Sequence, residues 1–278
     1  MFSTLFVPTL LTREKFIRRS AKEESTMQAT VISVSNPLGG TGKTTIAFHL
    51  AHGLAMLGYK VLAVDMDPKA SLTRAMGQRE ELITYSVKDL LTRSTTWWKC
   101  TLFVDQNLYL IPATDELAGM DYHMLSKPFS YMKLKKKLLP AKSEHDFIIL
   151  DTGPAYNLFS VNAWNSSDTI LMPFIPGPGT GADIAMVLRD FQDFDVEVQV
   201  IFNQVARTQA LANQARCYVE KRHRRVEFSK THIPRSSLIS ESIAHHEPVF
   251  LRHPDSRPAL ALKHLTSITA AALKESDI

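Results

Sequence analysis

The stretch Gly39–Thr45, which reads Gly-Gly-Thr-Gly-Lys-Thr-Thr, constrains the fold of this chain more than any other part of its sequence. It follows Thr30–Ser35, a short β-branched run that is typical of a strand. It leads into Thr44–Leu57, which has helical periodicity and stops before Gly58. A strand, a glycine-rich turn and a helix in this order predict a crossover unit of a parallel sheet.

Apolar runs alternate with helical patterns along the rest of the chain, which is the pattern of an α/β protein. We therefore predict a mostly parallel, twisted sheet with helices on both faces, formed by one domain over residues 27–278. The predicted strands are Thr30–Ser35, Lys60–Asp65, Asn107–Pro112, Asp146–Asp151, Thr169–Phe174, Val196–Phe202 and Val226–His232. The predicted helices cover residues 44–57, 114–125, 128–138, 157–166, 180–193, 208–223, 236–245 and 256–274.

Residues 1–26 differ from the rest of the chain. An apolar run, Phe2–Leu11, comes before a basic one, Arg13–Lys22, which is the reverse of the order in a secretory signal. Three interpretations stay open: a disordered leader, an arm that packs on the body or on a partner, and a helix that touches a membrane. Met27 precedes the first predicted strand and is an alternative start.

Composition sets broad limits on function. The net charge of +4 and a pI near 9 are compatible with nucleic acid or an anionic membrane as a partner. No apolar run in the sequence reaches the length of a transmembrane helix. The two cysteines, Cys100 and Cys217, are too few for a disulfide framework and fit a reducing cytoplasm.

The glycine-rich turn has the chemistry of a phosphate cradle. Glycines let backbone N–H groups turn inward around phosphate oxygens, and the start of a helix adds a positive dipole end. Lys43 would reach the β- and γ-phosphates of ATP, and the Thr44 hydroxyl would bind Mg²⁺. The predicted nucleotide-binding residues of this turn are Gly39, Gly40, Thr41, Gly42, Lys43, Thr44 and Thr45.

The turn departs from the standard Gly-x-x-x-x-Gly-Lys-Thr motif, because Pro37 stands where its first glycine would fall. It resembles the deviant Walker A box, Lys-Gly-Gly-x-Gly-Lys-Thr, of the ParA/MinD family of dimeric ATPases. Leu38 replaces the first, signature lysine of that box. In the family this lysine reaches the phosphates of the partner subunit, so the resemblance implies that Leu38 removes a cation where the transition state needs one.

Two carboxylates follow predicted strands and match family motifs. Val64–Lys69 (Val-Asp-Met-Asp-Pro-Lys) resembles the family's Asp-x-Asp-Pro-Gln, which implies that Asp67 orients or activates the attacking water. The run Phe147–Pro154 resembles Walker B and its switch, which implies that Asp151 holds Mg²⁺ through water. Carboxylates at these strand ends would lie beside the phosphate cradle. The predicted catalytic residues are Asp67 and Lys43, and the predicted metal-binding residues are Thr44, Asp67 and Asp151.

The C-terminal part carries weaker matches. Asn203 corresponds to a family position near the adenine, and Pro234 to a residue that packs on the base. Ile233–Phe250 resembles the ParA pattern Ile-Pro-Arg…Glu-Ala…Gly-Lys-Pro-Val, which favours ParA over MinD. The last helix also lacks a basic amphipathic end that would bind a membrane.

Nonspecific DNA binding is a further implication of the resemblance. Arg207 and Arg235 match family arginines with that role, and cations on one face would neutralise phosphates. Basic runs at 133–137 and 221–225 add charge, although such runs are also common on solvated surfaces. No helix-turn-helix precedes the glycine-rich turn, so sequence-specific operator binding is not expected.

The resemblance therefore implies a cytoplasmic, nucleoid-associated ATPase that forms a homodimer on binding ATP, binds DNA and segregates a plasmid or chromosome with a ParB-like adaptor. Because of Leu38, an ATP-binding scaffold with little or no hydrolysis stays open as the alternative. A MinD-like positioning ATPase, or an accessory of conjugation or cellulose synthesis with the same fold, is a third possibility. An iron protein is disfavoured, because neither cysteine lies in a glycine-rich context suited to a cluster.

Overall fold

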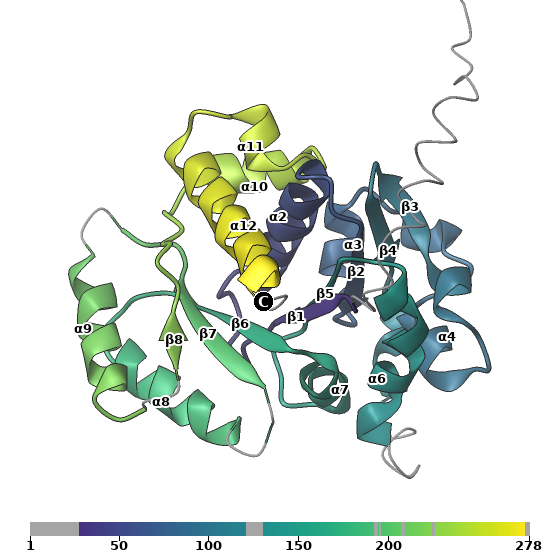
Figure 1. Cartoon of the computed structure of the whole chain (residues 1–278), viewed down its shortest axis with the longest axis horizontal. Coiled ribbons are helices and arrows are strands. Elements are labelled where there is room, and N and C mark those ends of the chain that lie inside the picture. The colour runs from purple at the N-terminus through teal and green to yellow at the C-terminus, as the bar shows by residue number, and fades with distance from the viewer. Residues whose placement is uncertain are drawn as a thin grey trace, which may run out of the picture.

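Eight strands form one sheet in the computed structural model, which describes residues 28–120, 130–191, 194, 196–206, 209–223 and 226–275. The strand order is β3-β4-β2-β5-β1-β6-β7-β8 (Figure 1). All neighbouring strands are parallel except the edge pair β3 and β4, which is antiparallel. The predicted fold class is confirmed.

The strands are β1 (Thr30–Val34), β2 (Val61–Met66), β3 (Leu102–Asp105), β4 (Leu108–Ile111), β5 (Phe147–Thr152), β6 (Thr169–Phe174), β7 (Glu197–Phe202) and β8 (Glu227–Phe228). The helices are α2 (Lys43–Met56), α3 (Ser71–Ala75), α4 (Val87–Thr92), α6 (Lys133–Leu138), α7 (Leu158–Ser166), α8 (Thr180–Asp190), α9 (Ala210–Glu220), α10 (Ser237–Ala244), α11 (Val249–Arg252) and α12 (Arg257–Glu275). Short 3-10 turns lie at 80–82, 97–100, 115–117, 130–132 and 139–143.

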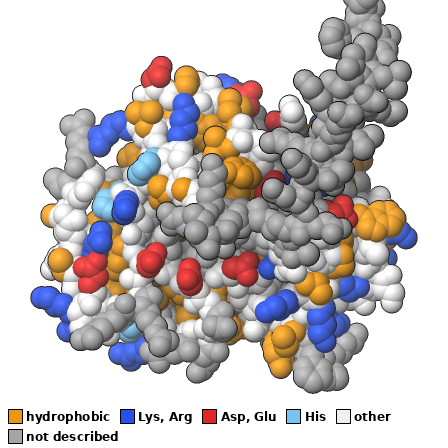
Figure 2. Space-filling model, in the orientation of Figure 1, with side chains coloured by type: hydrophobic (Ala, Val, Ile, Leu, Met, Phe, Trp, Pro, Cys, Tyr) orange, Lys and Arg blue, Asp and Glu red, His pale blue; other side chains and the backbone are white. Residues whose placement is uncertain are grey.

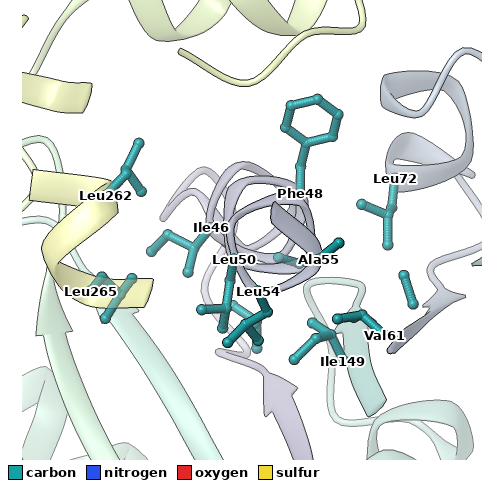
Figure 3. Packing of buried hydrophobic residues seen from close by; sticks show 14 of the residues in the cluster. Ile46, Phe48, Leu50, Leu54, Ala55, Val61, Leu72, Ile149, Leu262 and Leu265 are labelled. Atoms are coloured by element: carbon teal, nitrogen blue, oxygen red, sulfur yellow. The ribbon is translucent and has the colours of Figure 1, made fainter. Parts of the chain in front are cut away.

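Helices cover both faces of the sheet (Figure 1). Helices α2, α10, α11 and α12 lie on one face, and α4, α6, α7, α8 and α9 lie on the other. Figure 3 shows Leu50 and Leu54 of α2 pointing toward the sheet, and Ile46 toward Leu262 and Leu265 of α12. All five side chains are buried. Each Å² of apolar surface removed from water contributes about 25 cal/mol, so this packing stabilises α2 against the central strands and α12.

The register of the central strands brings the predicted site residues to one edge of the sheet. Asp151 near the end of β5 lies opposite Val34 of β1 on one side and opposite Asp65 of β2 on the other. The carboxyl ends of these three parallel strands therefore meet where α2 begins. This is the crevice in which an open α/β sheet binds its ligands.

Six of the seven predicted strands are found within two residues of their predicted limits. Val226–His232 is wrong in extent: only Glu227–Phe228 pairs with β7, and Pro234 then makes an isolated bridge to Val205. The helix predicted at 114–125 is also wrong at its start, because residues 115–117 form a 3-10 turn and Gly119 has a φ of 76°. Residues 121–129 lie outside the described residues, as does the leader 1–26.

Candidate functional site

The glycine-rich loop between β1 and α2 has a conformation that requires glycine. Gly40 and Gly42 have φ values of 73° and 92°, in the left-handed region. A Cβ atom at Gly42 would lie 2.0 Å from Nδ2 of Asn203, so a side chain there would displace Asn203 as well as strain the backbone. The Gly42 carbonyl accepts the N–H of Ile46 at 3.0 Å and starts α2.

Side chains from the ends of β1 and β7 support this loop. Asn203, which is 3% exposed, donates from Nδ2 to the Thr41 carbonyl at 2.8 Å. Gln204 donates from Nε2 to the Gly40 carbonyl at 3.2 Å. Asn36 accepts the N–H of Leu38 at 2.8 Å and donates to the Pro173 carbonyl at 2.7 Å. These hydrogen bonds connect the loop to the ends of two strands, and such preorganisation favours tight binding.

Lys43 is a buried cation at the first turn of α2. Its side chain donates from Nζ to the carbonyl of Leu38 at 2.9 Å, and the residue is only 6% exposed. Burial lowers the pKa of Lys43, while the negative charges of Asp151 and Asp67 raise it in part. Lys43 forms no ion pair within the part of the chain that the structure describes. A phosphate group would supply the anion that this ammonium lacks.

Asp65 is a buried carboxylate that the sequence did not single out. Its Oδ1 accepts the N–H of Asp67 at 3.0 Å, and its Oδ2 accepts the N–H and the hydroxyl of Thr73, each at 2.8 Å. Burial, with the Asp67 charge as a smaller contribution, raises the pKa of Asp65 to about 6. These contacts fix the path of the chain after β2, so Asp65 is a positioning residue for Asp67.

Asp151 differs from Asp65 because its carboxylate lacks such hydrogen bonds within the described part of the chain. It is fully buried, and neither carboxylate oxygen has a hydrogen bond of good geometry to any described residue. Burial raises its pKa well above the usual value, the Asp65 charge adds to the increase, and the nearby Thr44 hydroxyl opposes it. A carboxylate that is buried without a partner is costly, so Asp151 needs either a proton or a cation.

Mg²⁺ fits this position. The ion prefers carboxylate and hydroxyl oxygens, keeps several waters and binds substrate phosphates, so it needs few protein ligands. Thr44 and Asp151 offer such oxygens next to the glycine-rich loop. A group of three or more His, Cys, Asp or Glu side chains arranged around a metal is absent from the described residues. The site therefore suits a metal that arrives with its nucleotide.

Asp67 lies between the end of β2 and the loop after β5. Its Oδ1 accepts the N–H of Lys69 at 2.9 Å, and the residue is 7% exposed. A Cβ at Gly153 would be 3.1 Å from the Asp67 carboxyl, so a side chain there would push this carboxyl by a few tenths of an ångström. The structure thus brings Lys43, Asp67 and Asp151 together, as predicted from the strand ends.

Pro234 borders a separate cavity of about 210 Å³ next to the end of β7. The lining residues are Val205, Ala206, Gln209, His232, Pro234, Arg257, Leu260 and Ala261. Pro234 makes a bridge to Val205, two residues after Asn203, so the segment of Pro234 lies beside the end of β7 that carries Asn203. Asn203 itself donates to the loop backbone, whereas Pro234 lines the cavity.

The basic residues proposed for DNA have different positions. Arg235 is exposed, and Arg207 lies outside the described residues. In the run 133–137, Lys133 donates to the Leu91 carbonyl at 3.1 Å, and Lys137 donates to Arg93 and Thr95 at 3.1 and 2.9 Å. Two of these lysines therefore hold the loop after α4, and the run is not a simple row of free charges.

A strand, a left-handed glycine turn and a helix with a buried lysine at its start define a P-loop nucleotide-binding protein. A family model described as an AAA domain matches residues 29–199. The sporulation initiation inhibitor protein Soj of Bacillus subtilis (strain 168) is 29% identical over 252 residues, which cover 87% of this chain and 98% of Soj. This chain belongs to that AAA domain family and is a P-loop ATPase of the ParA/MinD type.

Solved structures show the same fold. Cobyrinic acid a,c-diamide synthase from Mycobacterium smegmatis, with a bound ATP analogue and magnesium, has a TM-score of 0.73 at 21% identity and covers 89% of this chain and 97% of its own. A putative plasmid partition protein from Borrelia burgdorferi B31, bound to AMPPNP, has a TM-score of 0.72 at 21% identity, covering 89% and 100%. Within the described residues, no helix combines the length and the apolar character needed to cross a membrane.

Proposed function

We propose that this protein binds ATP and Mg²⁺ at Gly39–Thr45 and uses them as a switch for DNA partition. The observation that supports nucleotide binding most is the buried Asp151 carboxylate, which lies beside the Thr44 hydroxyl and has no hydrogen bond of good geometry to a described residue. Mg²⁺ held there with the β- and γ-phosphates would supply the missing positive charge. Lys43 would leave the Leu38 carbonyl and bind the phosphates, which offer a full negative charge in place of a dipole.

The remaining site residues have distinct proposed roles. Backbone N–H groups of the residues from Gly39 to Thr45 cradle the phosphates, and Asn203 keeps that cradle in shape. Pro234 packs against the base in the adjoining cavity. Asp67 orients the attacking water, because it reaches the crevice from β2 and is not committed to an ion pair within the described residues. Mg²⁺ supplies charge stabilisation of the phosphoryl group when it is bound.

The switch would act through association. ATP favours a homodimer, the dimer binds DNA in the nucleoid through Arg207 and Arg235, and a ParB-like adaptor on the plasmid or chromosome triggers release. Relatives named for partition or sporulation control and the exposed position of Arg235 support this proposal. To move from mostly monomer to mostly dimer, ATP must favour the dimer by about 5 kcal/mol.

Calorimetry and phosphate release test the nucleotide site directly. ATP should bind the parent more tightly with Mg²⁺ than with EDTA. The variant Asp67→Ala should bind ATP with little change but lose any turnover measured for the parent with DNA. Equal affinity with and without Mg²⁺ would reject the assignment of Asp151, and unchanged turnover in Asp67→Ala would reject the water-positioning role.

A scaffold that binds ATP without hydrolysing it is the second candidate, and Leu38 is the observation that favours it. Leu38 is 37% exposed at the mouth of the loop and has no charge or hydrogen-bond donor in its side chain. A scaffold would form an ATP-dependent dimer of long lifetime with no phosphate release. Measurement of both quantities on one preparation separates the candidates, and a lack of DNA binding would instead favour a MinD-like positioning protein.

A further inference from the structure

A groove between α8 and α9 lies outside the nucleotide site and has a composition suited to another ligand. It encloses about 620 Å³ and is lined by Ala182, Ala185, Met186, Arg189, Tyr218, Arg222 and His223. The α8 residues recur with the spacing of one helix face, so they form a continuous stripe along the groove. In Figure 2, Lys and Arg side chains appear along the left edge of the molecule, over α9.

The shape of the groove is fixed by close contacts at one end. A Cβ at Gly181 would lie 2.9 Å from Cβ of Tyr218, so α8 and α9 approach there as closely as glycine allows. Arg222 places its guanidinium 3.8 Å from the centre of the Tyr218 ring and donates to the Tyr218 carbonyl at 3.1 Å. These contacts hold one cation and one aromatic ring in defined positions on the groove wall.

The charge of the lining is positive, and its two arginines form no ion pair with any described residue. Arg189 and Arg222 are the full cations, and the lining includes no Asp or Glu. Two acidic neighbours have other partners, since Asp190 accepts the Tyr156 hydroxyl and Glu220 pairs with Arg216 at 2.7 Å. Asp183 lies on α8 one turn before Met186 and is outside the lining. Met186 is 56% exposed and, with Ala182 and Ala185, makes up the apolar part of the lining, which we call the apolar floor, beside the two cations.

We infer that this groove docks an amphipathic helix with acidic flanks from a partner protein. An apolar stripe would cover Met186 and the alanines, and acidic side chains would pair with Arg189 and Arg222, in the helix-in-groove mode of peptide recognition. DNA would use the cations but would gain nothing from the apolar floor. The inference rests on the proposed function only in that a partition switch needs a protein partner.

A peptide display selection tests the groove in the absence of nucleotide and DNA. Its result therefore does not depend on whether the proposed function in DNA partition is correct. The probe is a library of helical peptides of about 20 residues, long enough for several turns, selected on the full chain. Counter-selection on the double variant Arg189→Glu, Arg222→Glu removes peptides that bind elsewhere. The groove predicts enrichment of peptides with Leu at helical spacing and Asp or Glu beside it.

Affinities of the enriched peptide by fluorescence anisotropy complete the test. Arg189→Glu and Arg222→Glu should each weaken binding by about tenfold or more, because each places an acidic side chain against an acidic partner. Lys221→Glu is the matched control, with the same charge change outside the lining, and should alter binding by less than about twofold. Met186→Ala, at an exposed position where α8 tolerates truncation, should weaken binding if the floor is used.

Three results would overturn the inference: no enrichment after counter-selection, enriched peptides without acidic residues, or equal effects of Arg222→Glu and Lys221→Glu. A duplex DNA that displaces the peptide, and whose own affinity falls in the same two variants, would show a nucleic-acid site instead. Circular dichroism of each variant excludes loss of folding as the cause of weaker binding.

Discussion

The ammonium of Lys43 donates a hydrogen bond of 2.9 Å to the carbonyl of Leu38, five residues earlier in the same loop. Lys43, the predicted phosphate-binding cation, is therefore hydrogen-bonded to the backbone of the phosphate-binding loop itself. Since Lys43 is buried and has no ion pair among the described residues, its charge is stabilised mainly by this carbonyl and by the fields of Asp151 and Asp67.

Lys43→Ala removes the only side-chain cation in the phosphate cradle. We expect ATP affinity, measured by calorimetry with Mg²⁺, to fall at least about tenfold, or about 1.4 kcal/mol. Lys221→Ala, on the surface after α9, is the control and should bind as the parent does. Unchanged ATP affinity in Lys43→Ala would mean that the loop does not bind phosphates.

Asp151→Asn tests the metal position. Without a cation the buried Asp151 carboxyl must either take up a proton or remain an unpaired charge, and Asn has neither cost, so we expect the protein without nucleotide to keep or gain thermal stability. The stabilisation by Mg²⁺ and ATP, about 2.7 kcal/mol at one hundred times Kd for a one-site ligand, should then be largely lost. Thermal unfolding with Mg²⁺, ATP or both measures this difference.

Asp105→Asn serves as the matched control for Asp151→Asn, because Asp105 is exposed at the far edge of the sheet. It should leave the effect of Mg²⁺ and ATP unchanged. If Asp151→Asn responds to Mg²⁺ and ATP as the parent does, the metal lies elsewhere.

His49 gives the fold a pH dependence. Burial lowers its pKa from 6.5 to about 4, the His52 charge adds to the decrease, and the hydrogen bond to the Thr45 carbonyl opposes it in part. The ring bridges the Thr45 carbonyl at 2.7 Å and the N–H of Val249 at 3.1 Å. Between pH 4 and 6.5 the unfolded chain binds more protons at this residue, so its contribution to stability falls as the pH falls through that range. The full effect is on the order of 3 kcal/mol.

The variant His49→Gln can make the same two hydrogen bonds and does not titrate. The free energy of unfolding of the parent minus that of His49→Gln should therefore decrease between pH 6.5 and 4, as measured by urea unfolding. The opposing contribution of Asp65, whose pKa is raised to about 6, is common to both proteins and cancels. A constant difference over this range would show that His49 does not carry the effect.

Arg235→Glu tests the DNA face. We expect binding to random duplex DNA with ATP to weaken for all sequences alike, and the slope of log K against log salt to decrease by about one. Lys99→Glu, an exposed lysine in the 3-10 turn before β3, is the charge-matched control. Equal losses in the two variants would indicate a general charge effect and not a DNA contact at Arg235.

The sheet and the loop could be predicted from the sequence because both depend on local signals. Strong apolar runs fixed β5 and β6, and the glycine pattern fixed the turn before α2. The short helices α3 and α4 were missed, although Ser86 and Asp89 form a capping box at the start of α4 that a search for caps would have found.

The supports of the site could not be predicted in the same way. Three supporting residues hydrogen-bond to loops that are distant in the sequence or tightly bent: Asn36, Asp65 and Gln204. No sequence motif identifies the residues that they contact. The bridge from Val205 to Pro234 replaced the expected long last strand because β8 lies at the edge of the sheet and pairs with β7 over only two residues. The supporting contacts and the length of β8 depend on packing between segments distant in the sequence, which hydrophobic periodicity does not predict.

Leu38→Lys addresses the departure from the family motif. The γ-phosphate and its transition state carry several negative oxygens, and one subunit offers Lys43 and one Mg²⁺ to neutralise them. The resemblance to ParA/MinD proteins implies a second lysine at this position, which contacts the phosphates bound by the opposite subunit. Leu38 is exposed and able to face a partner, but it has no charge to offer.

We therefore expect the parent to bind ATP and to hydrolyse it slowly or not at all, and Leu38→Lys to hydrolyse it faster and to dimerise more strongly with ATP. Loss of an arginine finger costs about 10³–10⁵ in rate, which sets the upper scale of the gain. Leu38→Met is the control, since it keeps length and adds no charge. Phosphate release and sedimentation velocity should be measured on the three proteins together. If the parent matches Leu38→Lys in both, another residue already supplies the charge, and Leu38 is no obstacle to turnover.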